Sequence, residues 1–178
     1  MRGRKQTMSS PLTPIESRAA ISGATAADAE SLAALYAEAL PPGWPAQELA
    51  AACAGPNRAV LKAADGARLH GFVIVQFAAD EAEILGIAVT KAQRRRGYAA
   101  SLLQAAIRVC QSRFASCIYL EVAESNTPAR KLYEKFGFLV SGRRKNYYRL
   151  SGSASETALI MRRDVELPAP VDLERSCT

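Results

Sequence analysis

The fold of this chain is decided by residues 87–100, which read IAVTKAQRRRGYAA. The apolar triplet Ile87-Ala88-Val89 predicts the end of a strand, a helix is expected from Tyr98, and a basic turn with one glycine joins the two. Such a turn directs several unpaired backbone N–H groups towards one point at the helix N-terminus, where the helix dipole adds a partial positive charge. Both features suit a phosphate or pyrophosphate group.

The side chains of the turn fit the same interpretation. Gly97 lets the backbone approach a phosphate closely, and the small side chain of Ala99 keeps that approach open. Arg94, Arg95 and Arg96 add charge-assisted contacts. Three arginines at a helix N-terminus oppose the dipole, and an anionic ligand removes this mismatch. A solvated basic face explains the same run, so the turn by itself leaves both interpretations open.

The segments on either side of the turn predict a mixed sheet with helices on both faces. Asp65-Gly66 predicts a tight hairpin turn, and Gly137 a left-handed helix end. Hairpins that lead into a strand–helix–strand crossover predict an α/β (mixed α+β) fold. The expected strands are 18–24, 58–63, 69–78, 82–89, 117–122, 138–148 and 157–162, and the expected helices are 26–40, 45–54, 98–114 and 128–136.

The two ends of the chain differ from this central part. Residues 1–17 lack periodicity and predict a flexible basic leader, residues 18–163 a single domain, and residues 164–178 a loose, proline-containing tail. The net charge is +6, and half of it comes from Arg2, Arg4 and Lys5. Such a leader attracts polyanions without sequence preference, so we expect no specific nucleic-acid partner. A start at Met8 is the alternative explanation of this segment.

Composition excludes several classes of protein. No stretch approaches the roughly 18 consecutive apolar residues of a transmembrane helix, and the basic residues at the start lead into polar ones rather than into a signal sequence. We therefore expect a soluble cytoplasmic protein with no membrane partner. The cysteines form no C-x-x-C pair and have no nearby histidine, so we expect no metal; they are Cys53, Cys110, Cys117 and Cys177.

Two motifs resemble a known family. Arg94-x-x-Gly97-x-Ala99 matches the (Gln/Arg)-x-x-Gly-x-(Gly/Ala) signature of the GNAT acetyltransferases, and residues 120–138, LEVxxSNxxAxxLYxxxGF, resemble the second half of their fold. The resemblance covers about residues 18–163 and is closest to the RimI type, the N-acetyltransferases that modify the N-terminal alanine of a small-subunit ribosomal protein. Further matches to this type are Pro42-Gly43-Trp44, Glu83-x-x-x-Ile87-Ala88-Val89, Arg143-x-x-x-Tyr147-Tyr148 and Thr157-Ala158-x-x-Met161. Gly86 departs from it, because this type usually has asparagine there.

The resemblance implies a GNAT-like three-layer α/β/α sandwich, with a mostly antiparallel sheet splayed at its centre, and acetyl-CoA as co-substrate. Ile87, Ala88 and Val89 would offer backbone groups to the pantetheine arm, almost like an added strand. Asn126 would hold the same arm, and capping of the next helix is the alternative. The pyrophosphate would lie on Arg94, Arg95, Arg96, Gly97, Tyr98, Ala99 and Ala100.

Acetyl-CoA is an activated thioester, so direct attack by an amine needs only a proton acceptor for the amine and a proton donor for the leaving thiolate. The resemblance implies Glu121 as the general base and Tyr133 as the acid. A strand-end carboxylate that pairs with an arginine is the alternative for Glu121. Packing beside Phe136 is the alternative, or an additional role, for Tyr133. His70, the single histidine, is expected to be structural.

The acceptor predicted from the resemblance is the N-terminus of a ribosomal protein, bound by a monomeric enzyme beside Trp44 and Tyr147. Deprotonation at pH 7 costs an α-amine about 1 kcal/mol and a lysine about 4.6 kcal/mol, which agrees with an α-amine. A GNAT enzyme acting on lysine or a small-molecule amine, a catalytically idle acetyl-CoA-binding module, and an RNA- or ribosome-associated protein stay open as alternatives. The basic run 143–145 either flanks the acceptor or forms a solvated strand edge.

Overall fold

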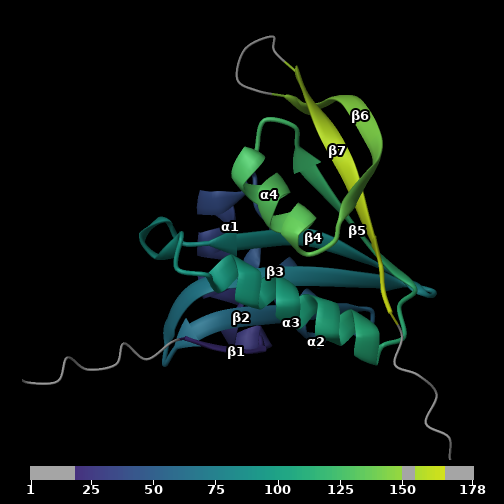
Figure 1. The fold of residues 1–178 in the computed structure, drawn as a ribbon. Coiled ribbons are helices and arrows are strands. Elements are labelled where there is room, and N and C mark those ends of the chain that lie inside the picture. Colours follow the sequence, from purple (N-terminus) through teal and green to yellow (C-terminus); the bar gives the residue numbers. More distant parts are fainter. Residues whose placement is uncertain (1–18, 150–154, 167–178) are drawn as a thin grey trace, which may run out of the picture.

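The computed structural model describes residues 19–149 and 155–166, without the side chains of residues 146–149 and 155. Seven strands in this part of the chain form one sheet in the order β1-β2-β3-β4-β5-β7-β6 (Figure 1). The strands are β1 (Ala20–Gly23), β2 (Arg58–Asp65), β3 (Arg68–Ala78), β4 (Glu81–Val89), β5 (Cys117–Ala123), β6 (Leu139–Arg149) and β7 (Ser155–Asp164). The helices are α1 (Ala29–Ala39), α2 (Ala46–Ala54), α3 (Tyr98–Ser112) and α4 (Thr127–Lys135), with short 3-10 turns η1 (Ala26–Asp28) and η2 (Lys91–Gln93).

The predicted three-layer sandwich is confirmed. Figure 1 shows α3 and α4 on one face of the sheet and α1 and α2 on the other. Strand β3 is buried on both faces, because its side chains alternate between two cores. Val73 packs in the core under α3, whereas Phe72 and Ile74 pack in the core under α1 and α2. No helix of the described residues is long and apolar enough to cross a membrane.

Helices and strands lie close to the predicted ranges, with two local differences. In the first hairpin Asp65 pairs with Arg68, so the two-residue turn is Gly66-Ala67 rather than Asp65-Gly66. Gly66 alone takes up the positive φ, at +56°. The first predicted helix begins with a 3-10 turn, because the carboxylate of Asp28 accepts a hydrogen bond from the Thr25 N–H (2.8 Å) and turns the chain there.

The C-terminal strand continues past the predicted domain boundary at residue 163. Asp164 pairs with Cys117 in the sheet, and the Val165 N–H donates to the Ser116 carbonyl at 2.9 Å. The predicted leader, residues 1–17, and the tail beyond residue 166 lie outside the described residues.

The sheet opens at its centre, as predicted. β4 and β5 form the one parallel pair of the described sheet, and their pairing ends at Ile84 and Leu120 although both strands continue. A bulge accounts for the separation: Val75 pairs with Ile84 and Ile74 with Gly86, so Leu85 is an extra residue in β4. Because a bulge bends its strand and increases its twist, β4 turns away from β5 at this point. We call the resulting opening between residues 85–89 and 121–123 the fork.

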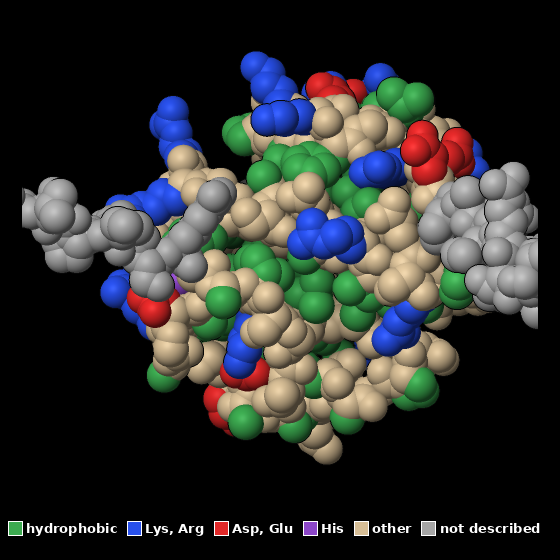
Figure 2. Space-filling view, turned by 60° about the horizontal axis from the view of Figure 1, so that its bottom comes forward, with side chains coloured by type: hydrophobic (Ala, Val, Ile, Leu, Met, Phe, Trp, Pro, Cys, Tyr) green, Lys and Arg blue, Asp and Glu red, His purple; other side chains and the backbone are tan. Residues whose placement is uncertain are grey.

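One face of the molecule has an apolar centre with basic side chains around it (Figure 2). Figure 2 shows hydrophobic side chains gathered near the middle of one face, with lysine and arginine side chains around them and acidic side chains near its edges. Among the described residues, the large hydrophobic side chains with the greatest exposure are Leu139 (73%), Phe114 (66%) and Val140 (46%).

Candidate active site

The basic turn ends one side of the fork and begins α3. Gly97 is the N-cap of α3 in the left-handed region (φ 87°, ψ −3°), and Arg95 also has a positive φ of 64°. A non-glycine residue with positive φ is uncommon and is often found at a functional turn. The turn is fixed to the end of β4, because Arg94 Nε donates to the Val89 carbonyl at 3.3 Å. The turn is also held at its helical end, since the Tyr98 ring stacks on the ring of buried His70 with 5.5 Å between their centroids.

These residues fit a pyrophosphate. The first turn of α3 contains no acidic residue and has no side-chain cap, so its N-terminal N–H groups are not satisfied by the residue that precedes them. Residues 94–97 are exposed, and the first three of them carry guanidinium groups in the segment directly before α3. Arg94 uses Nε to hold the turn, so its contribution to an anion comes from the rest of the guanidinium.

The fork exposes one edge of β4. Ile87, Ala88 and Val89 pair with β3 along one edge, while the pairing with β5 has already ended. The backbone groups on that second edge therefore face the fork, and binding of the pantetheine arm along them, which the resemblance implies, remains a prediction. Across the fork, the exposed Asn126 caps α4 by accepting a hydrogen bond from the Ala129 N–H at 3.3 Å. The capping alternative is thus confirmed, and the arm-binding role remains a prediction.

Glu121 lies at the start of the fork. It is the first residue of β5 beyond the last pair with β4. Its neighbours Leu120 and Val122 face the core under α3 and α4, so Glu121 points to the opposite face of the sheet. There its Oε1 forms an ion pair with Arg144 Nη1 of β6 at 3.0 Å. The alternative role expected for Glu121, a strand-end carboxylate that pairs with an arginine, is therefore present in the structure, and its role as general base remains a prediction.

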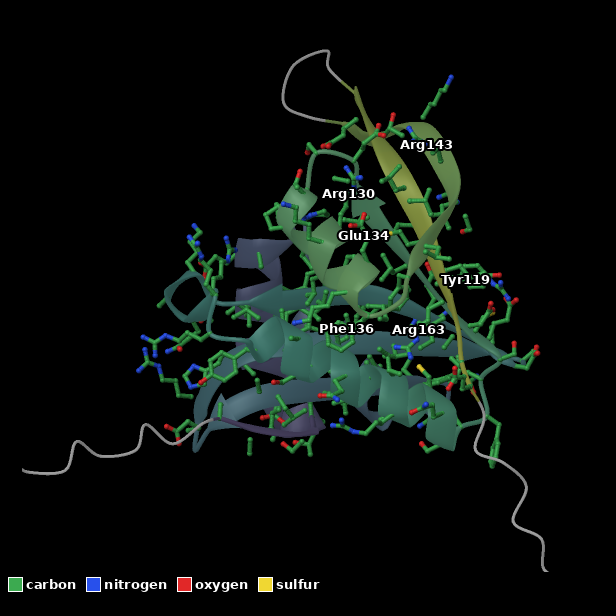
Figure 3. All side chains as sticks on the ribbon, in the orientation of Figure 1. Tyr119, Arg130, Glu134, Phe136, Arg143 and Arg163 are labelled. Atoms are coloured by element: carbon green, nitrogen blue, oxygen red, sulfur yellow. The ribbon has the colours of Figure 1, made fainter. Side chains whose placement is uncertain are left out.

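Glu121 opens onto a pocket of about 250 Å³ on this face. Its polar lining consists of Gln76, Glu81, Glu83, Tyr119, Glu121 and Arg144. Partial burial and then the charge of Glu121 raise the pKa of Glu83, while Arg144 opposes this shift. Figure 3 shows Tyr119 on β5, well away from the β6–β7 end that carries Arg143.

Sequence analysis named Glu83 only as part of the resemblance, without a role in the site, and left the role of Arg144 undecided. The signal for Glu83 was an acidic residue within the apolar strand EAEILGIAV. The parallel register places Glu83 opposite Tyr119 and thus near Glu121, and this register is set by the tertiary structure.

Tyr133 lies on the other side of β5. It is 6% exposed, belongs to the core under α3 and α4, and meets Phe138 edge to face at 6.0 Å. The packing role expected for Tyr133 is therefore present, with the ring of Phe138 as one partner and Phe136 packed against the same core. Glu121 and Tyr133 therefore lie on opposite faces of the sheet.

Trp44 is connected to the pocket through Arg58 and Gln76. Its ring stacks on the Tyr36 ring, with 5.8 Å between the two centroids. The guanidinium carbon of Arg58 lies 5.1 Å from the Trp44 ring centroid, in a cation–π contact. Arg58 in turn donates to Gln76 Oε1 at 3.2 Å, and Gln76 lines the pocket. Direct contact between Trp44 and an acceptor remains a prediction. The side chain of Tyr147, the other predicted acceptor contact, lies outside the described residues.

The glycine at position 86, where the RimI type usually has asparagine, has a structural explanation. A Cβ added there would lie 3.3 Å from the Tyr36 hydroxyl and 3.4 Å from Leu40. Tyr36 thus occupies the space in which a side chain at position 86 would lie, and burial raises the pKa of its phenol.

Comparison with known proteins gives consistent matches. The model of the acetyltransferase (GNAT) family matches residues 29–138. The [ribosomal protein bS18]-alanine N-acetyltransferase of Haemophilus ducreyi is 42% identical over 101 residues, which cover 57% of this chain and 70% of that protein. A Bacillus subtilis protein with the same name, marked putative, is 39% identical over 52% of this chain and 60% of its own length. The crystal structure of the ribosomal-protein-S18-alanine N-acetyltransferase from Escherichia coli superposes with a TM-score of 0.76 at 27% identity, covering 85% of this chain and 97% of the other.

Proposed function

Because this chain belongs to the GNAT acetyltransferase family, we propose that it transfers an acetyl group from acetyl-CoA to the N-terminal α-amine of a protein. Family membership implies acetyl-CoA as the co-substrate. The acceptor we propose begins with alanine and is a small-subunit ribosomal protein. The names of the relatives from Haemophilus ducreyi and Escherichia coli support this acceptor. We place the reaction in the cytoplasm and propose a monomeric enzyme.

The observation that carries this proposal is that Glu121 lies at the fork on one face of the sheet, while Tyr133 lies in the core on the other face. A thioester held along the free edge of β4 would lie between the two side chains. The amine would then approach from the pocket side, where Glu121 lies, and the sulfur would leave on the side of α4. This arrangement separates the proton acceptor from the proton donor, which a direct transfer requires.

Each residue has one task in the transfer. Glu121 accepts one proton from the α-ammonium, directly or through a water molecule, and releases it to solvent. The neutral amine nitrogen then forms its bond to the acetyl carbon and loses a second proton to Glu121 as the carbon–sulfur bond breaks. One of these two protons is released in the net reaction, and the other replaces the proton that Tyr133 gives to the sulfur. The Tyr133 hydroxyl donates its proton to the departing sulfur, since a phenol with a pKa near 10 is a suitable donor to a thiolate with a pKa near 8.5. Residues 94–100 and the edge of β4 bind and orient the co-substrate.

The acidic pocket favours a cationic acceptor without choosing between an α-ammonium and a lysine. The choice rests on the cost of deprotonation, about 1 kcal/mol against about 4.6 kcal/mol at pH 7, because one partly exposed carboxylate meets the first cost more easily. A lysine or a small polyamine is therefore the acceptor to test against the α-amine.

A radiolabelled-acetyl assay tests the proposal with three acceptors: a peptide with a free N-terminal alanine, the same peptide blocked at its N-terminus and carrying an internal lysine, and a polyamine. We expect the free N-terminal peptide to be acetylated fastest, with a rate that rises through neutral pH. Glu121→Gln should lose most of this rate, whereas Glu124→Gln, at an exposed carboxylate paired with Arg143, should keep it. Preference for the blocked lysine peptide or for the polyamine would overturn the acceptor, and absence of transfer to all three would leave the idle-module alternative.

A further inference from the structure

Arg144 contacts the proposed base from a neighbouring strand. Glu121 pairs with Ile160 of β7, and Ile160 pairs with Gly142 of β6, so these three residues share one face of the sheet. Arg144, two residues further along β6, lies on the same face and reaches back to Glu121 at 3.0 Å. Its neighbour Arg143 lies on the opposite face and pairs with Glu124 at 2.7 Å instead.

The charges around this contact are unequal. Among the described residues that line the pocket, Glu81, Glu83 and Glu121 are acidic, and Arg144 is cationic; Tyr119 and Gln76 complete the polar wall. The guanidinium therefore lies where an incoming ammonium would meet the carboxylate of Glu121. An ammonium and a guanidinium cannot occupy the same side of one carboxylate oxygen at hydrogen-bonding distance.

We propose that Arg144 is a displaceable counter-ion of Glu121. In the free enzyme its guanidinium occupies the position beside Glu121 where the acceptor ammonium binds, and it leaves this position when the acceptor arrives. This inference rests on the proposed function. Arg144 is a positioning residue, because it acts through Glu121 and not on the reacting atoms. Acceptor binding is then an exchange of one cation for another between Glu121 and Glu83.

Two features make the exchange feasible. β6 is an edge strand of the described sheet, and the Arg144 side chain is 52% exposed. This side chain can therefore turn towards solvent without disturbing the core. A solvent-facing ion pair of this kind changes an equilibrium by at most about fivefold, so its loss is readily compensated by a new ammonium contact. In the free enzyme Arg144 also opposes the rise in the pKa of Glu83 that burial and the charge of Glu121 cause.

Steady-state kinetics of Arg144→Met and Arg143→Met test this role. Both variants remove one positive charge from β6, the first beside Glu121 and the second beside Glu124 on the opposite face. At pH 8.5 we expect Arg144→Met to lower the acceptor KM about two- to fivefold, because the competing cation is gone, and to leave the KM for acetyl-CoA unchanged. The acid limb of its kcat/KM profile should move upward by as much as about 0.7 pH unit, since Glu83 then binds a proton more readily.

Arg143→Met should show neither change. An acceptor KM that rises in Arg144→Met would mean that Arg144 binds the acceptor, and a KM and pH profile equal to those of Arg143→Met would mean that it does not compete; either result overturns the inference. Both variants are measured with the acceptor that the wild-type enzyme acetylates fastest among the three tested above. A wrong acceptor assignment then appears in the wild-type comparison, and a wrong role for Arg144 appears in the variants.

Discussion

Substitution of Gly97 separates the backbone role of the basic turn from its role in anion binding. Gly97 has φ +87°, a conformation that costs an L-residue about 1–2 kcal/mol. For a protein of this length that cost lowers Tm by about 2–8 °C. Gly137 provides a matched control, because its φ is +81° and an added Cβ there would meet nothing within 4 Å. Gly97→Ala and Gly137→Ala should therefore lose similar stability.

Affinity for acetyl-CoA should distinguish the two positions. Gly137→Ala should bind acetyl-CoA like the wild type, and Gly97→Ala should bind it more weakly. Gly97→Glu adds a carboxylate at about 4 Å from the proposed pyrophosphate, where like charges repel by about 1–4 kcal/mol, so affinity should fall by a further factor of about five to a thousand.

Calorimetric titration with acetyl-CoA measures the affinity of each variant, and thermal unfolding shows that each is folded. Wild-type affinity in a folded Gly97→Glu variant would refute the assignment of the pyrophosphate to this turn. A loss of affinity in Gly137→Ala as large as that in Gly97→Ala would show that strain alone explains the effect.

Three further changes test other parts of the structure. Tyr133→Phe keeps the ring against Phe138, so stability should change by no more than about 1 kcal/mol while kcat falls about 10²–10⁴-fold; an unchanged kcat would leave Tyr133 with packing alone. The hydrogen bond from Lys62 lowers the pKa of Asp28, so this carboxylate stabilises the fold above its unfolded pKa near 3.9 and loses that effect as the pH falls below it. Urea unfolding should accordingly show Asp28→Asn to be about 1 kcal/mol less stable at pH 7, with the difference shrinking in acid. Trp44→Ala releases Arg58 and, through it, Gln76, so the acceptor KM should rise more than the KM for acetyl-CoA, and the opposite pattern would place this loop away from the acceptor.

Local pattern was sufficient for most of the fold. The three- and four-residue spacing of Leu102, Leu103 and Ala106 predicts α3, because one apolar stripe must face the sheet. The turn at Arg94–Gly97 was also predictable, since its chemistry lies within a few consecutive residues. The hairpin turn was misplaced by one residue because Asp65-Gly66 and Gly66-Ala67 both offer a glycine, and the pairing of Asp65 with Arg68 decides between them.

The candidate site depended on contacts between distant segments. Glu121 and Tyr133 were expected from the resemblance, yet their placement on opposite faces of β5 follows from the register of β5 with β7 and from the packing of α4. The partners of Glu121 come from β4 and β6, and no spacing along the chain indicates them.

By itself the sequence determined the helices, the strands and the glycine-containing turn before α3, because periodicity and turn chemistry act over a few neighbouring residues. Only the tertiary structure decided that Leu85 bulges from β4, that the fork therefore opens beside Glu121, and that Arg144 rather than Arg143 meets this carboxylate. The physical reason is that side chains alternate between the faces of a sheet, so a shift of one residue in register would exchange the two arginines.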